Sequence, residues 1–369
     1  MPYKMIQVGT GGFGAAWCQQ FIPPNVKDRT VEVVAAADIN PDNLLNAMEH
    51  LGLPAERCYT DVRKAFAENK ADFCAIVVPP AFHESIVDIA LEHGVHILSE
   101  KPISDTLEAS VRIAEKVKIA GLKMAVTMSH RFDQDKTALR NLLRSGRFGD
   151  LDYLVCRFTC DCRVDGAWGA FRYRIDDPLM VEGSVHHLDI LADLAGAKCD
   201  TIYARTWNPA WSAFKGDSQA LVTMLFGNGV HAMYEGAKTN AVGLNGWTNE
   251  YIRAECEKAT LTMQNREIEC FPYNEAQSNE QHREGTGCKL TLPEGHKWQN
   301  ALLIEQFAKW LGGGNAMETQ VEENLQSVAL IFAAIQSNRT GLPVKVQEFL
   351  AAAKEKVISE MNMSQRPNQ

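Results

Sequence analysis

A glycine-rich turn directly after a short apolar segment is the feature that most constrains how this chain can fold. Residues 4–8 are apolar enough to predict a buried strand, and Gly9-Thr10-Gly11-Gly12-Phe13-Gly14 follows at once, before a helical pattern that runs to about Phe21. Gly9, Gly11 and Gly14 match the spacing G-x-G-x-x-G. The first glycine allows a tight turn, the second lets the backbone approach a pyrophosphate, and the third lets the helix pack closely on the strand. The spacing therefore predicts a strand–turn–helix unit that binds phosphates at the helix N-terminus.

A second apolar segment ends in an acidic residue. Residues 31–37 predict another buried strand, and Asp38 follows, 38 - 14 = 24 residues beyond the last glycine of the turn. A carboxylate at this place accepts hydrogen bonds from the adenosine ribose and repels a 2′-phosphate. Because residues 39–41 contain no lysine or arginine that would bind such a phosphate, we expect NAD as the cofactor in preference to NADP. A helix-capping role for Asp38 is compatible with this one.

Strand and helix patterns continue to alternate along the first third of the chain. The expected segments are a helix over 61–69, a strand over 73–78, a turn at Pro79-Pro80, a helix to about 93, a strand over 96–99, a helix over 106–120 and a strand over 124–127. This alternation is typical of an α/β Rossmann-type doubly wound parallel sheet. The strand over 96–99 runs into Glu100-Lys101-Pro102. Lys101 is therefore expected at the carboxyl edge of the sheet, where such folds bind ligands.

The pattern changes beyond about residue 128. Alternating stretches over 152–163, 218–226 and 229–235 predict strands of a large, mostly antiparallel open sheet. Helical patterns near 136–144, 185–195, 301–311 and 321–338 are expected to cover this sheet. The chain has 369 residues, which exceeds what one core usually organises. We therefore expect a Rossmann domain over 1–127 and an α+β domain over 128–369, with a long loop at 274–299 and a disordered tail after about residue 363.

Composition excludes several classes of protein. The net charge is -9 and no basic block offsets it, which argues against nucleic acid or an anionic membrane as a partner. No apolar leader segment opens the sequence, and we expect a cytoplasmic protein. The ten cysteines are therefore expected to be reduced. Cys156, Cys160 and Cys162 alternate with polar residues, which favours one face of a strand over a metal site. We expect no metal ion.

Taken together, these motifs resemble the glucose-fructose oxidoreductase and inositol dehydrogenase (Gfo/Idh/MocA) family. The resemblance spans nearly the whole chain and rests first on Glu100-Lys101-Pro102 at the end of a Rossmann strand. Further matching segments are Pro79-Pro80 followed by His83, the run from Glu182 to Asp189, and residues 333–344. The resemblance implies an oxidoreductase that binds a nicotinamide dinucleotide in its first domain. It also implies a homodimer or homotetramer assembled through the sheet of the second domain.

The resemblance assigns roles to particular positions. Lys101 matches the lysine that touches the substrate hydroxyl and the nicotinamide ribose, and His186 matches the catalytic histidine. Glu182 stands where the family usually has aspartate, so it is expected either to contact the substrate or to orient His186. The positions expected to bind the cofactor are Gly9, Gly11, Gly12, Phe13, Gly14, Asp38, Pro79, His83, Glu100 and Lys101.

The residue types support these roles independently. If a helix begins near residue 182, the i, i+4 spacing places Glu182 and His186 on one face, where a carboxylate raises the basicity of an imidazole. Alcohol oxidation needs a base for the hydroxyl proton, and the Lys101 ammonium would favour the developing alkoxide. His187 is either a second polar contact to the substrate or an interface residue. His83 lies either beside the nicotinamide or in a simple contact at a helix start.

Two arginines just before the histidine segment are further candidates. Arg172 and Arg174 would bind a polyol, a carboxylate or a phosphate, or else form surface salt bridges. The sequence as a whole favours an NAD-dependent dehydrogenase that oxidises a secondary hydroxyl of a sugar, an inositol or a sugar derivative. The alternatives are an NAD-dependent glycosidase of the same fold and a non-catalytic NAD-sensing regulator.

Overall fold

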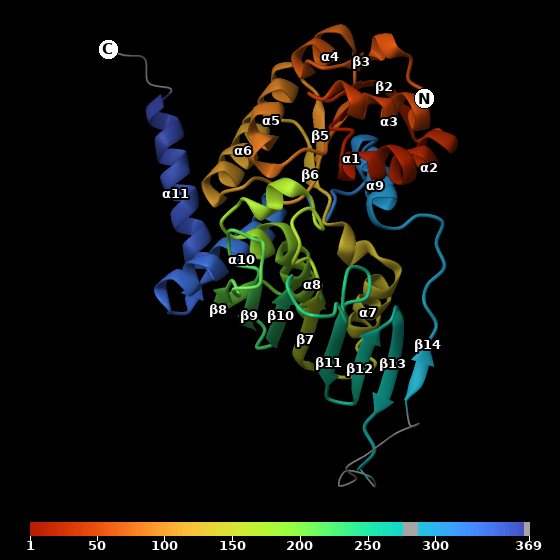
Figure 1. The fold of residues 1–369 in the computed structure, drawn as a ribbon. Helices are drawn as coiled ribbons and strands as arrows, with labels where there is room; N and C mark the ends of the chain where they lie inside the picture. The colour runs from red at the N-terminus through yellow and green to blue at the C-terminus, as the bar shows by residue number, and fades with distance from the viewer. Residues whose placement is uncertain (276–286, 365–369) are drawn as a thin grey trace. The chain divides into compact units, whose positions relative to one another are not determined.

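The computed structural model describes residues 1–275 and 287–364, and Figure 1 shows its elements. The chain forms two compact units. The first unit contains residues 1–129, 297–328 and the C-terminal segment from residue 350, and the second contains residues 130–296 and 329–349. This division differs from the expected one, because two C-terminal segments return to the first unit.

The first unit is built on a six-stranded parallel sheet with the strand order β3-β2-β1-β4-β5-β6. This order and the helices between the strands confirm the doubly wound α/β fold. The strands are β1 (Tyr3–Val8), β2 (Val31–Ala37), β3 (Cys58–Tyr59), β4 (Phe73–Ile76), β5 (His96–Ser99) and β6 (Met124–Val126). The helices between them are α1 (Phe13–Ala16), α2 (Ile22–Lys27), α3 (Leu45–Leu51), α4 (Val62–Glu68), α5 (His83–Glu92) and α6 (Leu107–Ala120).

Three local predictions differ from the structure. The helical segment after the glycine turn does not stop near Phe21 but passes through a π-helical turn, Trp17–Phe21, and continues as α2 to Lys27. Strand β4 ends at Ile76, two residues before the predicted end, since Pro79 and Pro80 begin a short 3-10 turn there. Strand β3 was not predicted, because two residues are too short for a period to be recognised.

Helix α9 (Gln299–Leu311) belongs to the first unit, so the expectation that it covers the second sheet was wrong. The ring of Phe307 packs edge-on against Phe73 of β4, with 5.3 Å between centroids. The Asn25 side chain also donates a hydrogen bond to the carbonyl of Ala301. An apolar stripe indicates that a helix is packed but not which core receives it. Helix α10 (Val321–Thr340) passes from the first unit into the second, and α11 (Val346–Ser364) returns to the first.

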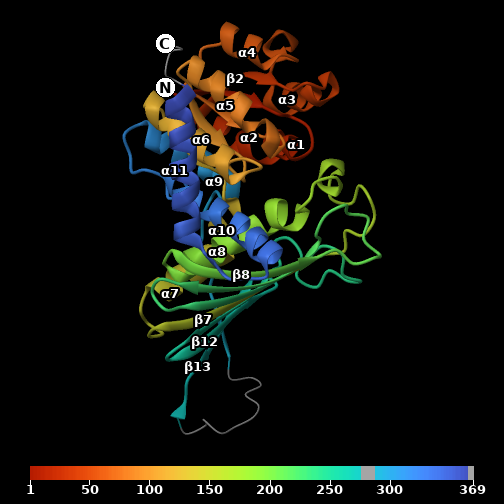
Figure 2. The same ribbon diagram turned by 90° about the vertical axis from the view of Figure 1, so that its left-hand side faces the viewer.

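The second unit is built on a nine-stranded sheet with the order β14-β13-β12-β11-β7-β10-β9-β8-β15. Only β7 and β10 pair in parallel among these strands, so the prediction of a mostly antiparallel sheet is confirmed. Figure 2 shows α8 on one side of this sheet. The strands are β7 (Leu151–Thr159), β8 (Cys199–Trp207), β9 (Gln219–Phe226), β10 (His231–Ala237), β11 (Tyr251–Cys256), β12 (Ala259–Gln264), β13 (Glu267–Pro272), β14 (Cys288–Leu290) and β15 (Val344–Lys345). The α-helices α7 (Gln134–Arg144) and α8 (Val185–Ala195) lie wholly within this unit, and the C-terminal half of α10 joins them.

Strand β7 is shorter than the predicted strand over 152–163. It ends at Thr159, and residues 160–162 continue beside the end of β10 through backbone hydrogen bonds to Ala237 and Lys238. Cys156, Cys160 and Cys162 are all buried, although the last two lie beyond the strand. All ten cysteines are free thiols in the structure. Cys160 and Cys162 therefore lie outside the regular strand, but their thiols are still in the core.

Part of the predicted 274–299 loop, residues 276–286, lies outside the described residues, as does most of the predicted tail, residues 365–369. The described part of the loop contains the short strand β14. Helix α11 extends to Ser364 and was not predicted. Within residues 1–275 and 287–364, none of the helices combines the length and the apolar character needed to cross a bilayer.

Candidate functional site

The glycine turn joins β1 to α1 and is too crowded for side chains at two positions. Gly9 has φ +87°, and a Cβ there would lie 2.0 Å from the carbonyl oxygen of Val77. A Cβ on Gly14 would lie 2.4 Å from the carbonyl oxygen of Gly9. The first position requires a tight turn and the second a close approach of helix to strand, as the motif needs. The turn therefore has the shape of a pyrophosphate-binding loop.

Asp38 follows β2 and its carboxylate holds the glycine turn. Oδ2 accepts hydrogen bonds from the backbone N–H groups of Thr10 and Gly11, at 2.8 Å and 3.1 Å. Oδ1 accepts hydrogen bonds from the backbone N–H of Asn40 and from the side-chain amide of Asn43, at 2.9 Å and 3.0 Å. Asp38 thus fixes the turn to the end of β2, a role that the sequence analysis did not foresee. Its position at the strand end is the one from which a carboxylate reaches a dinucleotide's ribose.

Glu100, at the end of β5, is buried and ties three segments of the first unit together. Oε1 accepts hydrogen bonds from the Trp17 indole at 3.0 Å and from the Asn300 amide at 3.2 Å. Oε2 accepts one from the backbone N–H of Lys101 at 3.2 Å. Burial raises the pKa of the Glu100 carboxyl above its usual range. These contacts place Lys101 directly after an anchored strand end, and the Lys101–Pro102 peptide bond is cis.

His83 begins α5 and is completely buried. Its Nε2 lies 2.8 Å from the carbonyl oxygen of Val78, and its Nδ1 lies 3.2 Å from the carbonyl oxygen of Ile103. The ring thus connects the segment after β4, which includes Pro79, with the segment after β5. Of the two interpretations left open for His83, these contacts favour the contact at a helix start.

Arg172 and Glu182 form an ion pair in the second unit. Nε and Nη2 of Arg172 each lie 2.8 Å from Oε2 of Glu182, whose side chain is 2% exposed. The guanidinium also lies over the rings of Phe171 and Trp168. Arg172 is therefore held by an almost buried carboxylate. Arg174 pairs at the surface with Asp165, which is the salt bridge considered from the sequence.

The histidine segment begins as a π-helical turn rather than as an α-helix. Leu179–Ser184 form this turn, and α8 continues it, so Glu182 lies in the π-helical part and His186 in the first turn of α8. The expected i, i+4 relationship between these residues therefore does not have regular α-helical geometry. The His186 ring is nearly buried and stacks on that of His130, with 3.9 Å between centroids and 15° between planes.

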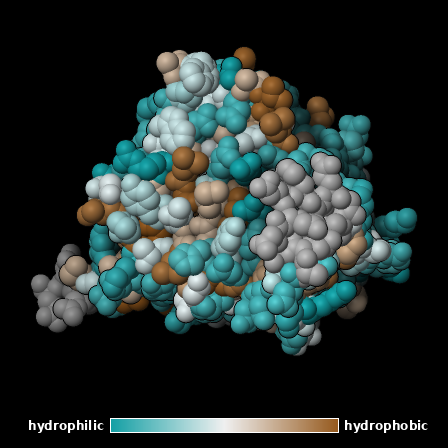
Figure 3. All heavy atoms as spheres, turned by 90° about the horizontal axis from the view of Figure 1, so that it is seen from below, coloured by the Kyte–Doolittle hydropathy of each residue, from teal (hydrophilic) through white to brown (hydrophobic). Residues whose placement is uncertain are grey.

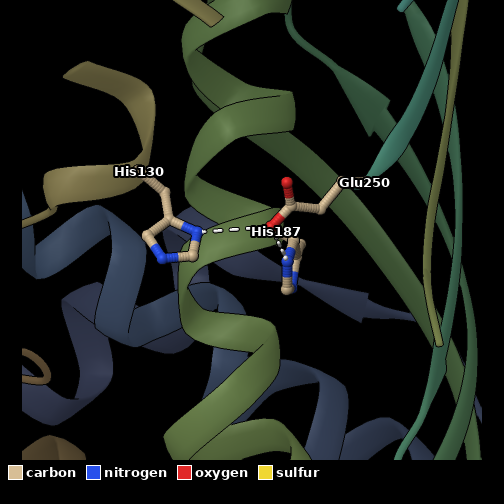
Figure 4. A group of neighbouring side chains, drawn as sticks. All are labelled: His130, His187 and Glu250. Carbon is tan, nitrogen blue, oxygen red and sulfur yellow. Dashed lines mark hydrogen bonds and ion pairs between the residues drawn. The ribbon is translucent and has the colours of Figure 1, made fainter. Parts of the chain in front are cut away.

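His187 is fully buried and lies in a polar cluster with His130 and Glu250, shown in Figure 4. Its Nε2 lies 3.4 Å from Oε1 of Glu250, and its Nδ1 lies 3.3 Å from the Tyr234 hydroxyl. Nδ1 of His130 lies 3.5 Å from the same Oε1. Burial lowers the pKa of His187 to about 4, so the ring is neutral at neutral pH. These contacts lie within the second unit, and they favour neither interpretation proposed for His187 from the sequence.

A buried lysine completes the cluster. Lys136 of α7 lies 2.8 Å from Oε2 of Glu250, 3.3 Å from Asp135 and 3.5 Å from Asp133. Burial alone would lower the pKa of Lys136, but the surrounding carboxylates raise it above its usual range. Burial alone would likewise raise the pKa of Glu250, but His130, His187 and Lys136 hold it well below its usual range. Sequence analysis missed this cluster, because no local spacing links residues from three separate segments.

Comparison with known proteins identifies the family. Residues 4–128 match the oxidoreductase family with an NAD-binding Rossmann fold, and residues 140–346 match the C-terminal alpha/beta domain of that family. An uncharacterized protein, y4oX, of Sinorhizobium fredii is 55% identical over 95% of this chain and 97% of its own length. An inositol 2-dehydrogenase of Corynebacterium glutamicum is 31% identical over 62% of this chain and 65% of its own length.

The fold comparison agrees. A crystal structure of an oxidoreductase from Agrobacterium radiobacter, in complex with NAD+, L-tartaric acid and magnesium, has a TM-score of 0.78 at 20% identity. It covers 94% of this chain and 99% of the other. The glycine turn, the Glu-Lys-Pro strand end and both matched domains lead to one conclusion. This chain belongs to the glucose-fructose oxidoreductase and inositol dehydrogenase (Gfo/Idh/MocA) family of oxidoreductases with an NAD-binding Rossmann domain.

Proposed function

We propose that this protein is an NAD-dependent dehydrogenase that oxidises a secondary hydroxyl of a sugar, an inositol or a sugar derivative. The observation that carries the proposal is the glycine turn held by the carboxylate of Asp38, in a chain related to inositol 2-dehydrogenase. A carboxylate at that strand end favours a free ribose 2′-hydroxyl over a phosphate, and hence NAD over NADP. Bound NAD supplies the acceptor for a hydride from the carbinol carbon.

His186 is proposed as the base that takes the hydroxyl proton. Its ring is nearly buried, stacks on the ring of His130 and lies nearly perpendicular to the ring of Trp247. A ring held in this way keeps one orientation, which a proton acceptor needs. Histidine also has a suitable pKa at neutral pH. The stacking on His130 therefore supports His186 as a positioned base.

Lys101 is proposed to orient the hydroxyl and to stabilise its developing negative charge. The residue follows a strand end that is anchored through the buried carboxylate of Glu100. An ammonium at the carboxyl edge of a parallel sheet lies where open α/β folds bind ligands. Glu182, four residues before His186 in the chain, is proposed to orient His186. Arg172 balances the charge of the Glu182 carboxylate.

The test is turnover with a panel of inositols, aldoses and sugar acids, read as NADH absorbance. We expect a substrate in this panel, and we expect Lys101→Ala and His186→Ala to lower kcat by about 10²–10⁴-fold while NAD still binds. Lys70→Ala and His50→Ala are matched controls, because both residues are exposed. Unchanged turnover in either test variant would refute the assigned role. Sugar release from a glycoside without net NADH would instead identify a glycosidase.

We further propose that the second sheet pairs with a second copy of this chain. The side of the sheet away from α8 carries exposed Tyr203, Leu221 and Met233 on neighbouring strands. Their alternation with buried residues places them on one face of the sheet. Figure 3 shows apolar residues among hydrophilic ones on this side of the molecule. A partly apolar face of this kind is typical of surfaces that pair with another protein.

A further inference from the structure

Two imidazoles and a carboxylate converge in the second unit on a point that the proposed dehydrogenase chemistry does not use. His130 lies in the short 3-10 turn before α7, His187 in the first turn of α8, and Glu250 directly before β11. Nδ1 of His130, Nε2 of His187 and a carboxylate oxygen of Glu250 all lie within 4.8 Å of one another. Figure 4 shows the three side chains pointing toward a common centre.

The separations are long for hydrogen bonds and are compatible with a shared ion. Oε1 of Glu250 lies 3.5 Å from Nδ1 of His130 and 3.4 Å from Nε2 of His187. A good N–H···O hydrogen bond is shorter, about 2.7–3.2 Å. Two ligand atoms that are each about 2.1 Å from a tetrahedral zinc ion lie about 3.4 Å apart. Both measured separations thus match the edge of a metal coordination shell.

The charge of the surrounding groups favours a cation. The ammonium of Lys136 is shared by the carboxylates of Asp133, Asp135 and Glu250. These four groups carry 1 - 3 = -2 charges, and all four side chains are almost completely buried. The fully buried ammonium of Lys238 adds one positive charge near His187, 4.1 Å from the centre of the Trp247 ring on which His187 stacks. Because buried negative charge needs compensation, the negative sum that remains favours a cation beside Glu250. Lys136 contacts Oε2 of Glu250, whereas Oε1 faces the two histidines and accepts a hydrogen bond from the backbone N–H of Thr248 at 3.3 Å.

The residues that contact the two histidine ligands are of the kinds that surround metal ligands in known sites. Nδ1 of His187 lies 3.3 Å from the Tyr234 hydroxyl, which lies 3.0 Å from the Ser184 hydroxyl. A hydrogen bond from the second nitrogen of a ligating histidine fixes its tautomer and presents the other nitrogen to the ion. The Trp247 ring packs edge-on against His130, with 5.3 Å between centroids. An apolar wall of this kind restricts water around a metal ion.

We propose that Nδ1 of His130, Nε2 of His187 and Oε1 of Glu250 bind a divalent transition-metal ion of the zinc type, with one coordination position left open. Two imidazoles and a carboxylate are the ligand set of open zinc and ferrous sites, whereas Mg²⁺ and Ca²⁺ prefer oxygen ligands alone. The ion would lie beside the ring of His186, which stacks on His130. The proposal does not depend on the dehydrogenase function, because binding of the ion is measured without any substrate or NAD.

The test is a titration of the chelator-treated full-length protein with Zn²⁺ in competition with a chromophoric chelator. We expect one Zn²⁺ per chain. Glu250→Gln, His130→Gln and His187→Gln should each weaken Zn²⁺ binding by more than about 100-fold. Mutation of a residue that only hydrogen-bonds to a metal ligand already lowers metal affinity by about 10–100-fold. His50→Gln is the matched control, because His50 pairs with Glu49 and belongs to the first unit, whereas the three ligands belong to the second. Absence of stoichiometric binding, or binding of equal strength in all the variants, would overturn the proposal.

A second measurement on the unmodified protein protects the test against variants that fail to fold. X-ray absorption at the zinc edge of the loaded protein should show two imidazole rings and oxygen ligands, with no sulfur. Sulfur in the shell would place the ion at the buried thiols of Cys160 and Cys162 and would overturn the assignment. Co²⁺ in place of Zn²⁺ should give visible bands that Mg²⁺ does not displace.

Discussion

The guanidinium of Arg172 places both Nε and Nη2 at 2.8 Å from one oxygen, Oε2, of the almost buried carboxylate of Glu182. A charge-assisted contact of this geometry is strong, and the carboxylate would be costly to bury without it. Glu182 is also the position that the sequence analysis matched to an aspartate of the family. The longer side chain therefore comes with an arginine that balances its charge.

The first prediction concerns this ion pair. We expect Arg172→Met to lower the free energy of unfolding by about 2–4 kcal/mol, because the almost buried carboxylate of Glu182 loses this ion pair. Urea titration measures the change. Arg174→Met is the matched control, since the Arg174–Asp165 pair is exposed, and we expect a loss below about 1 kcal/mol. Equal losses of unfolding free energy in the two variants would show that the buried Arg172–Glu182 pair stabilises the protein no more than the exposed Arg174–Asp165 pair.

The second prediction concerns Asp38. We expect Asp38→Ala to weaken NADH binding by about 10–100-fold, since hydrogen bonds to a charged group contribute about 1.5–3 kcal/mol. The ratio of the affinity for NADH to the affinity for NADPH should also fall, because Asp38 no longer repels the 2′-phosphate. Fluorescence titration with NADH and NADPH measures both effects. Asp42→Ala, an exposed acid in the next turn, is the control, and an unchanged preference in Asp38→Ala would contradict the assignment.

The first unit follows closely from local patterns in the sequence. Apolar runs, glycine spacing and the acid at the end of a strand are all short-range signals, and they identified the turn at Gly9, the carboxylate of Asp38 and the strand end at Lys101. Besides the short strand β3 and helix α11, they missed the location of α9. Its apolar stripe is as visible as any other, but Phe307 finds its partner, Phe73, more than two hundred residues earlier in the chain. Such pairing depends on tertiary packing, which the spacing of apolar residues along a helix does not encode.

The cluster around Glu250 is a second feature that could not be predicted from the sequence. His187 was noticed only because it follows His186, and neither His130 nor Glu250 carried any local signal. These residues are 187 - 130 = 57 and 250 - 187 = 63 positions apart and come from a 3-10 turn, a helix and a loop. Only the folded second unit brings their ligand atoms together. Predictions of metal sites from spacing succeed when two or more ligands share one element, which is not the case here.

The third prediction concerns pH. Nδ1 of His96 accepts a hydrogen bond from the backbone N–H of Lys123 at 2.9 Å, so the ring is in its neutral form. Burial, followed by the charge of Lys123, lowers the pKa of His96 below its usual value. Between this lowered pKa and about pH 6.5 the unfolded chain binds more protons than the folded one, so stability rises with pH in that window.

The measurement is the free energy of unfolding as a function of pH. His96→Asn keeps an acceptor near Nδ1 but does not titrate, so we expect the variant to lose the part of the slope that lies just below about pH 6.5. The wild type should therefore gain stability relative to His96→Asn as pH rises through that window. A constant difference between the two proteins across the window would show that His96 titrates equally in both states.

The fourth prediction concerns Lys136. Three carboxylates share this buried ammonium, and its removal would take one ion pair from each of them. We expect Lys136→Met to lower the free energy of unfolding by about 3–5 kcal/mol in the metal-free protein. Lys215→Met, which breaks the exposed pair with Asp176, should cost less than about 1 kcal/mol. If the proposed metal site is real, Zn²⁺ should restore part of the stability lost in Lys136→Met, because the ion supplies the missing positive charge.

The last prediction concerns assembly. Leu221 lies in β9, is 51% exposed, and faces the side of the sheet on which Tyr203 and Met233 are also exposed. If this face pairs with a second copy, an introduced carboxylate would be buried in the interface without a partner, at a cost of several kcal/mol. We therefore expect Leu221→Asp to shift the protein from an oligomer to a monomer, as measured by light scattering after gel filtration. Val242→Asp is the control, because Val242 is as exposed but lies outside the strands. A wild-type monomer, or an oligomer that survives Leu221→Asp, would mean that this face of the sheet does not hold two copies together.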